Sequence, residues 1–272
     1  MTFRDKLKNI SLKNNSLVCV GLDSDLAKIP VNIQNQEHPQ STFNKAIIEA
    51  THDLVCAYKP NTAFYESRGA RGIEALKITC DYLITHYPEI PIIIDAKRAD
   101  IGNTNEGYAK FVFDYLNADA ITVHPYLGKE ALKPFLERRD KEIFVLVRTS
   151  NPGAGELQDL NIDKVPLYQK LAQNIVNEWN YNDNCGIVVG ATYPTELENV
   201  RHIVKSMPIL IPGIGVQGGD VEKSVKAGID SQSLNAIINS SRGIIFASDG
   251  PDFAEKARYE AEKLKNEINK FR

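Results

Sequence analysis

Residues 95–104 of this 272-residue chain, DAKRADIGNT, combine charged residues in a pattern that packing alone does not explain. They follow an apolar run, Ile90–Ile94, that is typical of a parallel strand buried on both faces. Asp95 and Lys97 are two positions apart, so both side chains project from one face if the chain stays extended. Because a buried charge is costly unless it is paired, we interpret the pattern as a functional cluster and not as a solvated loop.

The elements that must position this cluster alternate between strand and helix along the whole chain. The strand-like runs are short, continuous and rich in β-branched residues, as buried parallel strands are. Amphipathic segments lie between most of them. The strands are expected at residues 17–21, 54–59, 91–95, 120–123, 143–147, 186–189, 209–212 and 234–239. The helices are expected at residues 43–53 (capped by Ser41 and Thr42), 72–86, 105–116, 129–138, 166–179, 194–204, 221–227 and 252–271.

This alternation predicts an α/β fold of the (β/α)8 TIM-barrel class, with one catalytic domain over residues 1–272. A doubly wound open sheet is the alternative. In such barrels the chemistry lies at the C-terminal ends of the strands, where this chain repeatedly has polar residues. A second lysine, Lys59, follows the second strand in the segment Tyr58–Asn61.

Two glycine-containing segments near the end of the chain indicate an anion site. The segment PGIGVQGGD, residues 212–220, follows the seventh strand, and Arg242 follows the eighth. Glycines allow backbone N–H groups to approach a phosphate, and these two loops form the usual phosphate site of the fold. Glycines that merely form turns are the alternative, but Arg242 favours phosphate because a guanidinium can bind it in a bidentate way.

The composition narrows the class of protein. A net charge of −3, with 43% hydrophobic and 25% charged residues, is ordinary for a soluble protein and argues against a general nucleic-acid binder. No apolar run approaches the roughly 20 residues of a membrane span, and the N-terminus lacks the apolar segment of a secretory signal. We therefore expect a cytoplasmic protein with buried, reduced thiols. The cysteines are Cys19, Cys56, Cys80 and Cys185.

The segment 95–104 resembles the DxKxxDIxxT signature of the orotidine 5'-phosphate decarboxylase family, and in particular its longer bacterial subgroup. Supporting segments cover the whole chain, and the long loops expected at residues 24–40 and 155–165 fit that subgroup. Ala99 stands where the subgroup commonly has glycine, a small change that we expect to be tolerated. The supporting segments are residues 21–23, 58–61, 149–154, 212–217 and 241–243.

The resemblance implies decarboxylation of orotidine 5'-phosphate to uridine 5'-phosphate and CO2, the last step of de novo pyrimidine nucleotide synthesis. Lys59, Asp95, Lys97 and Asp100 match the charged tetrad of the family. Lys97 would donate the proton to C6 of the pyrimidine, and Asp95 would lie beside the leaving carboxylate. Asp100 would reach, with Thr104, into the active site of a second subunit in a homodimer.

The resemblance also implies which residues bind the rest of the nucleotide. Asp23 and Lys59 would hold the ribose hydroxyls, and Ser150 would contact the pyrimidine amide. No metal or organic cofactor is implied, and the histidines lack the spacing of metal ligands. The phosphate would be held by the side chains of Gln217 and Arg242 and by backbone groups near Gly213, Gly215 and Gly243.

Three other functions remain open on the sequence alone. A related branch of Mg²⁺-dependent sugar-phosphate enzymes shares the DxKxxD segment. That branch has an acidic residue where this chain has Lys59, which counts against this function. A Schiff-base aldolase would use Lys59 or Lys97 as nucleophile. A nucleotide-binding barrel without turnover is the non-enzyme alternative, and the intact tetrad argues against it.

Overall fold

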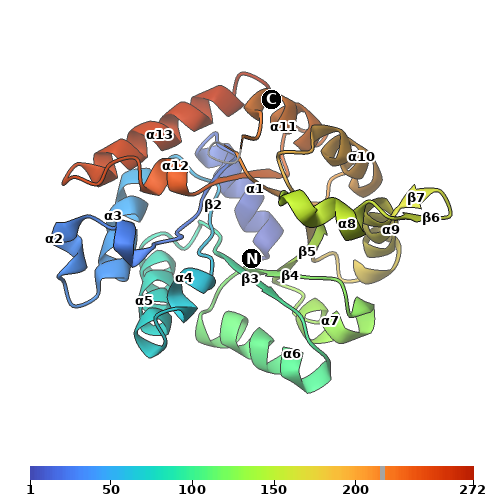
Figure 1. Ribbon diagram of the computed structural model, residues 1–272, viewed down its shortest axis with the longest axis horizontal. Helices are drawn as coiled ribbons and strands as arrows, with labels where there is room; N and C mark the ends of the chain where they lie inside the picture. The colour runs from blue at the N-terminus through green and yellow to red at the C-terminus, as the bar shows by residue number, and fades with distance from the viewer. Residues whose placement is uncertain (215–217) are drawn as a thin grey trace.

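A computed structural model describes residues 1–214 and 218–272, in which eight parallel strands form a barrel surrounded by helices (Figure 1). The strands are β1 (Val18–Val20), β2 (Ala57–Tyr58), β3 (Ile93–Arg98), β4 (Ala120–Val123), β5 (Glu142–Arg148), β8 (Cys185–Val189), β9 (Ile209–Pro212) and β10 (Ala236–Ser240).

The strand order is β2-β1-β10-β9-β8-β5-β4-β3, which brings the two ends of the sheet together. Between β2 and β3 the barrel is closed by isolated bridges, Tyr58 with Ile92 and Asn61 with Asp95. The expected (β/α)8 barrel is confirmed, and the open doubly wound sheet is wrong. The interior and the helix–sheet layer are filled by one cluster of buried apolar side chains.

Helices follow the strands and form the outer ring of the barrel (Figure 1). The main ones are α3 (Pro39–Thr51), α5 (Ala70–His86), α6 (Gly102–Ala109), α7 (Gly128–Leu136), α9 (Leu167–Asn174), α10 (Pro194–Val204), α11 (Val221–Gly228) and α13 (Phe253–Ile268). Shorter helices are α2 (Val31–Gln34), α4 (Ala63–Glu66), α8 (Gly155–Gln158) and α12 (Arg242–Ile245).

The expected elements agree with these bounds, mostly within a few residues, but three helices differ. α3 begins at Pro39 and not after Thr42, because proline suits the first turn of a helix. α6 begins three residues early, where the buried amide of Asn105 donates to the carbonyls of Asp100 (2.7 Å) and Ala131 (2.6 Å). The expected helices 105–116 and 166–179 both end in π-helical turns, Lys110–Tyr115 and Ile175–Trp179.

The two long loops contain regular structure of their own. The loop after β1 holds the 3-10 turn Leu26–Lys28 and α2. The loop after β5 holds α8 and an antiparallel hairpin of β6 (Asn161–Ile162) with β7 (Val165–Pro166). The hairpin and α8 lie at the rim of the barrel, on the right of Figure 1.

An N-terminal helix, α1 (Phe3–Lys13), was not expected from the sequence. It lies behind the barrel in Figure 1 and covers the N-terminal ends of the strands. Phe3 is buried and packs edge-on against Phe144 of β5, with ring centroids 5.5 Å apart. Arg4 binds Glu142 of β5 (3.2 Å) and donates to the carbonyl of Cys185 in β8 (2.9 Å). The helix therefore seals the end of the barrel opposite the catalytic end of this fold.

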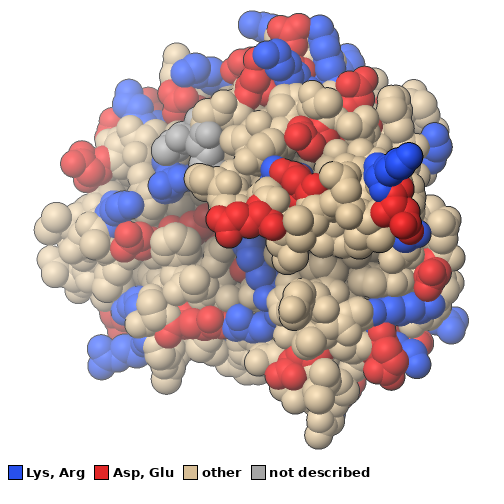
Figure 2. All heavy atoms as spheres, turned by 45° about the vertical axis from the view of Figure 1, so that its right-hand side comes forward, with Lys and Arg blue, Asp and Glu red and all other residues tan. Residues whose placement is uncertain are grey.

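All four cysteines are free and buried, as expected. Among the described residues no helix has the length and apolar character needed to cross a bilayer. Figure 2 shows basic and acidic side chains interspersed over the face in view.

Candidate active site

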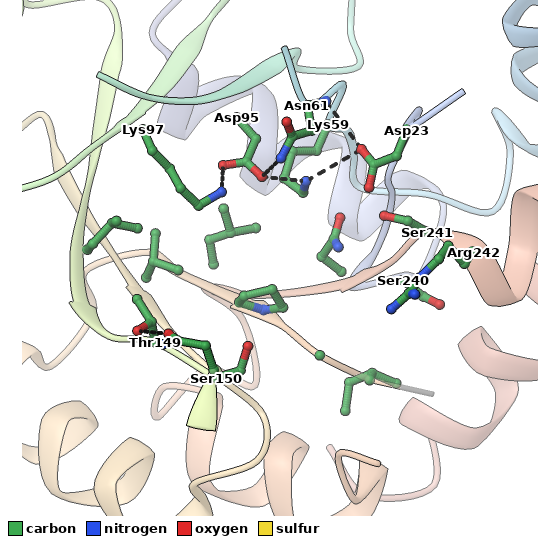
Figure 3. A pocket seen from close by; sticks show the side chains of 18 of the residues that line it. Asp23, Lys59, Asn61, Asp95, Lys97, Thr149, Ser150, Ser240, Ser241 and Arg242 are labelled. Carbon is green, nitrogen blue, oxygen red and sulfur yellow. Dashed lines mark hydrogen bonds and ion pairs between the residues drawn. The ribbon is translucent and has the colours of Figure 1, made fainter. Parts of the chain in front are cut away.

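The carboxylate of Asp95 is the centre of a charge cluster at the C-terminal end of β3 (Figure 3). Its Oδ2 accepts from Lys59 Nζ (3.0 Å) and from Asn61 Nδ2 (3.0 Å). Its Oδ1 accepts from Lys97 Nζ (2.6 Å) and from the hydroxyl of Thr122 (2.8 Å). Four donors from three neighbouring strands and their ends thus fix both oxygens of one buried carboxylate.

The electrostatics of the cluster keep these groups charged. Burial alone would raise the pKa of Asp95, but the ammonium groups of Lys59 and Lys97 lower it well below its ordinary value of 3.8. Burial would lower the pKa of Lys59, but Asp95 and Asp23 raise it above its ordinary 10.5. Lys59 Nζ lies 4.0 Å from Asp23 Oδ1, so the buried ammonium bridges two carboxylates.

The backbone of β3 reaches this arrangement by a route that the sequence did not predict. The chain does not stay extended as far as Lys97, which has a φ of +47°. This left-handed conformation is unfavourable for a residue with a Cβ and marks local strain. The pairing of β3 with β4 shifts between Ile94 and Arg98, which is a β-bulge. The bulge turns the chain so that Lys97 still contacts Asp95.

The cluster forms one wall of a cavity of about 530 Å³ at the C-terminal end of the barrel. Figure 3 shows Lys97, Asp95, Lys59 and Asp23 in a row along this wall. Thr149 and Ser150 lie across the cavity, and Ser240, Ser241 and Arg242 lie at a third side. The remaining lining is mainly apolar and includes Leu146, Val188, Leu210, Pro212 and Ile214.

The wall that carries Ser150 is held by side chains that the sequence analysis did not single out. Gln158 of α8 accepts from the Thr149 N–H through Oε1 (2.8 Å) and donates to the Thr149 hydroxyl through Nε2 (2.9 Å). Arg148 donates to the Thr149 carbonyl (3.0 Å). A Cβ on Gly190 would lie only 2.8 Å from the backbone of Ser150, so glycine is needed there for this close approach.

Arg148 itself is almost fully buried between elements that follow β5 and β8. Its guanidinium forms an ion pair with Asp159 (3.0 Å) and lies 3.9 Å from the ring centroid of Tyr193. These contacts fasten the α8 segment to the end of β5. The loop after β5 therefore supports one wall of the cavity.

The expected phosphate end is only partly described. Gly213, Arg242 and Gly243 line the cavity. Gly213 has a φ of +104°, which glycine adopts readily and other residues do not. Gly215 and Gln217 lie outside the described residues.

The other predicted site residues fall into two groups. Asp23, Lys59, Asp95, Lys97 and Ser150 all line the cavity. Asp100 and Thr104 do not, among the residues that the structure describes. They lie before and within the first turn of α6, and Thr104 is exposed.

Four further residues of the site were given no role from the sequence, although Asn61 and Thr122 carried a signal that is visible in retrospect. Asn61 ends the segment Tyr58–Asn61, in which only Lys59 was predicted to have a role. Thr122 is a polar residue in the otherwise apolar and fully buried strand β4. Gln158 ends the short helix α8, where no period marks it. Asn239 lines the cavity from β10, and its buried Oδ1 has no hydrogen-bond partner among the residues that the structure describes.

Within residues 1–214 and 218–272, no three His, Cys, Asp or Glu side chains gather in a way that could hold a metal ion. The charges at the cavity wall are instead paired with one another.

Comparison with known proteins identifies the family to which this chain belongs. A family model described as "Orotidine 5'-phosphate decarboxylase / HUMPS family" matches residues 16–257. The chain belongs to this family. It is 48% identical over 271 residues to an orotidine 5'-phosphate decarboxylase from Cellvibrio japonicus, covering 99% of this chain and 98% of that one. The family resemblance of residues 95–104 is thereby confirmed.

Solved structures of the orotidine 5'-phosphate decarboxylase family have the same fold. Leishmania donovani OMP decarboxylase superposes with a TM-score of 0.85 at 37% identity, covering 100% of this chain and 98% of that one. Leishmania donovani UMP synthase gives a TM-score of 0.88 at 38% identity and covers 100% of this chain. The chain spans 56% of that UMP synthase.

Proposed function

We propose that this chain is a carboxy-lyase that converts orotidine 5'-phosphate to uridine 5'-phosphate and CO2, the last step of pyrimidine nucleotide synthesis. The observation that carries the proposal is the Lys59–Asp95–Lys97 array in the cavity wall of a protein that belongs to this family. Relatives that match nearly the whole chain are named orotidine 5'-phosphate decarboxylase.

The nucleotide fits the cavity from its phosphate inward. Arg242 and backbone groups near Gly213 and Gly243 bind the phosphate. Asp23 and Lys59 bind the ribose hydroxyls. Ser150, across the cavity, contacts the pyrimidine amide.

The chemistry takes place between Asp95 and Lys97. The bond from C6 to the carboxylate breaks, CO2 leaves, and the electron pair stays on C6. The ammonium of Lys97 stabilises the developing negative charge because it is already held in place by Asp95. Lys97 then gives its proton to C6 and regains one from water. Asp95 beside the substrate carboxylate favours its departure.

We propose that no metal or organic cofactor takes part, since two fixed ammonium groups supply the positive charge that the reaction requires. A Schiff base at Lys59 is disfavoured because it needs a neutral amine, whereas Asp95 and Asp23 raise the pKa of Lys59. A Schiff base at Lys97 is disfavoured because its amine donates to the carboxylate of Asp95 (2.6 Å). Borohydride with substrate should therefore leave the protein unlabelled.

We also propose a cytoplasmic homodimer of one-domain subunits, with no nucleic-acid partner. Asp100 and Thr104 of one subunit would complete the site of the other. An exposed apolar surface beside them supports the pairing: Ile101 is 62% exposed and Tyr126 is 80% exposed. His124, two residues before Tyr126, contacts the Ala99 carbonyl (3.2 Å), which keeps these segments together.

The deciding experiment follows the loss of orotidine 5'-phosphate absorbance, with and without a chelator. We expect full turnover in both conditions. Turnover that stops on chelation and returns with Mg²⁺ would contradict the metal-free reaction, and no turnover in either condition would contradict the proposed function.

A further inference from the structure

The β-bulge of β3 leaves a single residue of β4 opposite the catalytic segment. Ile94 pairs with Ile121 and Arg98 pairs with Val123. Asp95, Ala96 and Lys97 therefore share one partner position on β4, which is Thr122. A strand with regular pairing would have a separate partner for each residue.

The Thr122 side chain occupies this position and contacts both charged residues of the bulge. Its Oγ1 accepts from the Lys97 backbone N–H (3.0 Å) and donates to Asp95 Oδ1 (2.8 Å). The same Oδ1 accepts from the Lys97 ammonium at 2.6 Å. Thr122, Asp95 and Lys97 thus form a closed ring of hydrogen bonds.

The direction of these bonds follows from the donors that each group has. A hydroxyl has one proton, and an ionised carboxylate has none. The Lys97 N–H donates to the Thr122 oxygen, so the hydroxyl proton is directed at Asp95. Thr122 is 1% exposed and is not among the described residues that line the cavity, so it acts through its two neighbours.

We propose that Thr122 is a positioning residue of the decarboxylation: its hydroxyl holds the left-handed backbone of Lys97 and the carboxylate of Asp95 in the relative position that the reaction needs. This inference rests on the proposed function. A hydroxyl in this position does two things that an apolar side chain of the same shape cannot do. It satisfies an N–H that the bulge turns away from regular pairing, and it fixes the oxygen that orients the Lys97 ammonium.

The preorganisation of Lys97 determines where the effect should appear. The ammonium stabilises charge that develops only in the transition state, so its displacement lowers kcat more than it weakens binding. Binding of the phosphate and ribose uses other residues, and the hydrogen bonds of Thr122 in the described structure go to Lys97 and Asp95 instead.

The test is Thr122→Val, which keeps the shape and removes the hydroxyl, compared with Thr122→Ser, which keeps the hydroxyl. We expect kcat for orotidine 5'-phosphate to fall about 10- to 100-fold in the valine variant, as for the loss of a hydrogen bond to a charged group. KM and the Kd of uridine 5'-phosphate should change less than about threefold. The serine variant should recover kcat to within about fivefold of wild type.

Thr79→Val is the matched control, because Thr79 is also buried and its hydroxyl also donates to one group and accepts from another, in α5 away from the cavity. It should lower thermal stability without changing kcat. If the Thr122→Val protein does not fold, Thr122→Ala makes the same comparison with Thr122→Ser.

Three outcomes would overturn the inference. An unchanged kcat in a folded valine or alanine variant would show that the hydroxyl does not position the cluster. Equal losses in the valine and serine variants would assign the effect to packing. Inactive wild type would refute the proposed function itself, whereas active wild type with an indifferent Thr122 would refute only the role of Thr122.

Discussion

The ion pair between Lys59 and Asp95 spans the seam of the barrel, where β2 and β3 are joined only by isolated bridges among the described residues. Asp95 is therefore both a site residue and a tie between the two ends of the sheet. Its neutralisation would leave Lys59, which is 3% exposed, without its nearest counter-charge. We expect Asp95→Asn to lower the free energy of unfolding by about 3 kcal/mol at neutral pH.

The same contacts predict a pH dependence. The folded state lowers the pKa of Asp95 below its ordinary 3.8, so the stabilisation is fully present above that pH. As the pH falls further, the unfolded chain takes up a proton that the folded chain does not, and the stabilisation is lost. The stability difference between wild type and Asp95→Asn, measured by urea unfolding, should therefore shrink at acid pH. A difference that stays constant from pH 7 to pH 3 would contradict this.

Asp114→Asn, in an exposed pair with Arg138, is the control for both stability measurements and should change the free energy of unfolding by less than about 1 kcal/mol.

Lys97→Ala should abolish turnover while sparing nucleotide binding. Both the proton and the stabilising charge disappear, so we expect kcat to fall more than about 10⁴-fold. The Kd of uridine 5'-phosphate, measured by calorimetry, should change less than about tenfold. Lys8→Ala, an exposed change on α1, should be indistinguishable from wild type. A raised KM with wild-type kcat would instead make Lys97 a binding group only.

Arg242→Ala should harm the phosphorylated substrate selectively. Loss of a charge-assisted contact should lower kcat/KM for orotidine 5'-phosphate about 10- to 100-fold and leave orotidine almost unaffected. Arg138→Ala, on the outer surface, should affect neither substrate. Equal losses on the two substrates would remove Arg242 from the phosphate site.

Gln158→Ala should loosen the wall that carries Ser150. The variant loses the side chain that binds both the N–H and the hydroxyl of Thr149. We expect the Kd of uridine 5'-phosphate to rise about 5- to 10-fold, which equilibrium binding would measure. Gln169→Ala on α9 serves as the control, since Gln169 contacts Tyr168 and does not line the described cavity. Unchanged affinity in the Gln158 variant would show that the wall holds without α8.

A mixing experiment tests the proposed exchange of residues between subunits. Asp100→Ala and Lys97→Ala should each be inactive alone. If Asp100 serves the partner's site, a mixed dimer has one intact site and one doubly damaged site, since a two-fold contact repeats the same arrangement. Equal mixing makes about half of the dimers mixed, so activity should return to roughly a quarter of wild type. Mixtures that stay inactive after confirmed subunit exchange would show that Asp100 acts within its own chain.

The barrel could be predicted from the sequence because each buried parallel strand is a short apolar run. Residues 120–123 and 209–212 match the observed strands residue for residue. The missed α1 did carry a signal, since Thr2 and Asp5 form a capping box and Phe3, Leu7 and Ile10 have helical spacing. Its strongly charged sequence hid that spacing.

The charged residues of the site could be predicted because their types are unusual at the end of a buried strand. The geometry between them could not. Left-handed backbone is expected at glycine or asparagine, and the residue type lysine does not predict the φ of +47° at Lys97. Thr122 has an ordinary explanation as a β-branched residue in a strand, so only the structure distinguishes its hydroxyl from its methyl group.

Helix α1 is synthesised long before the residues that it packs against in the folded barrel. Arg4 finds its partner Asp183 only 179 residues later in the chain. At roughly 5–20 residues per second, the first helix waits on the order of ten to forty seconds after its own synthesis before that partner emerges. Throughout this interval Phe3, Leu7 and Ile10 lack the barrel that buries them. The nascent chain therefore presents an unsatisfied amphipathic segment until the barrel is complete, and the floor of the barrel is sealed by a helix that is synthesised before the strands that it covers.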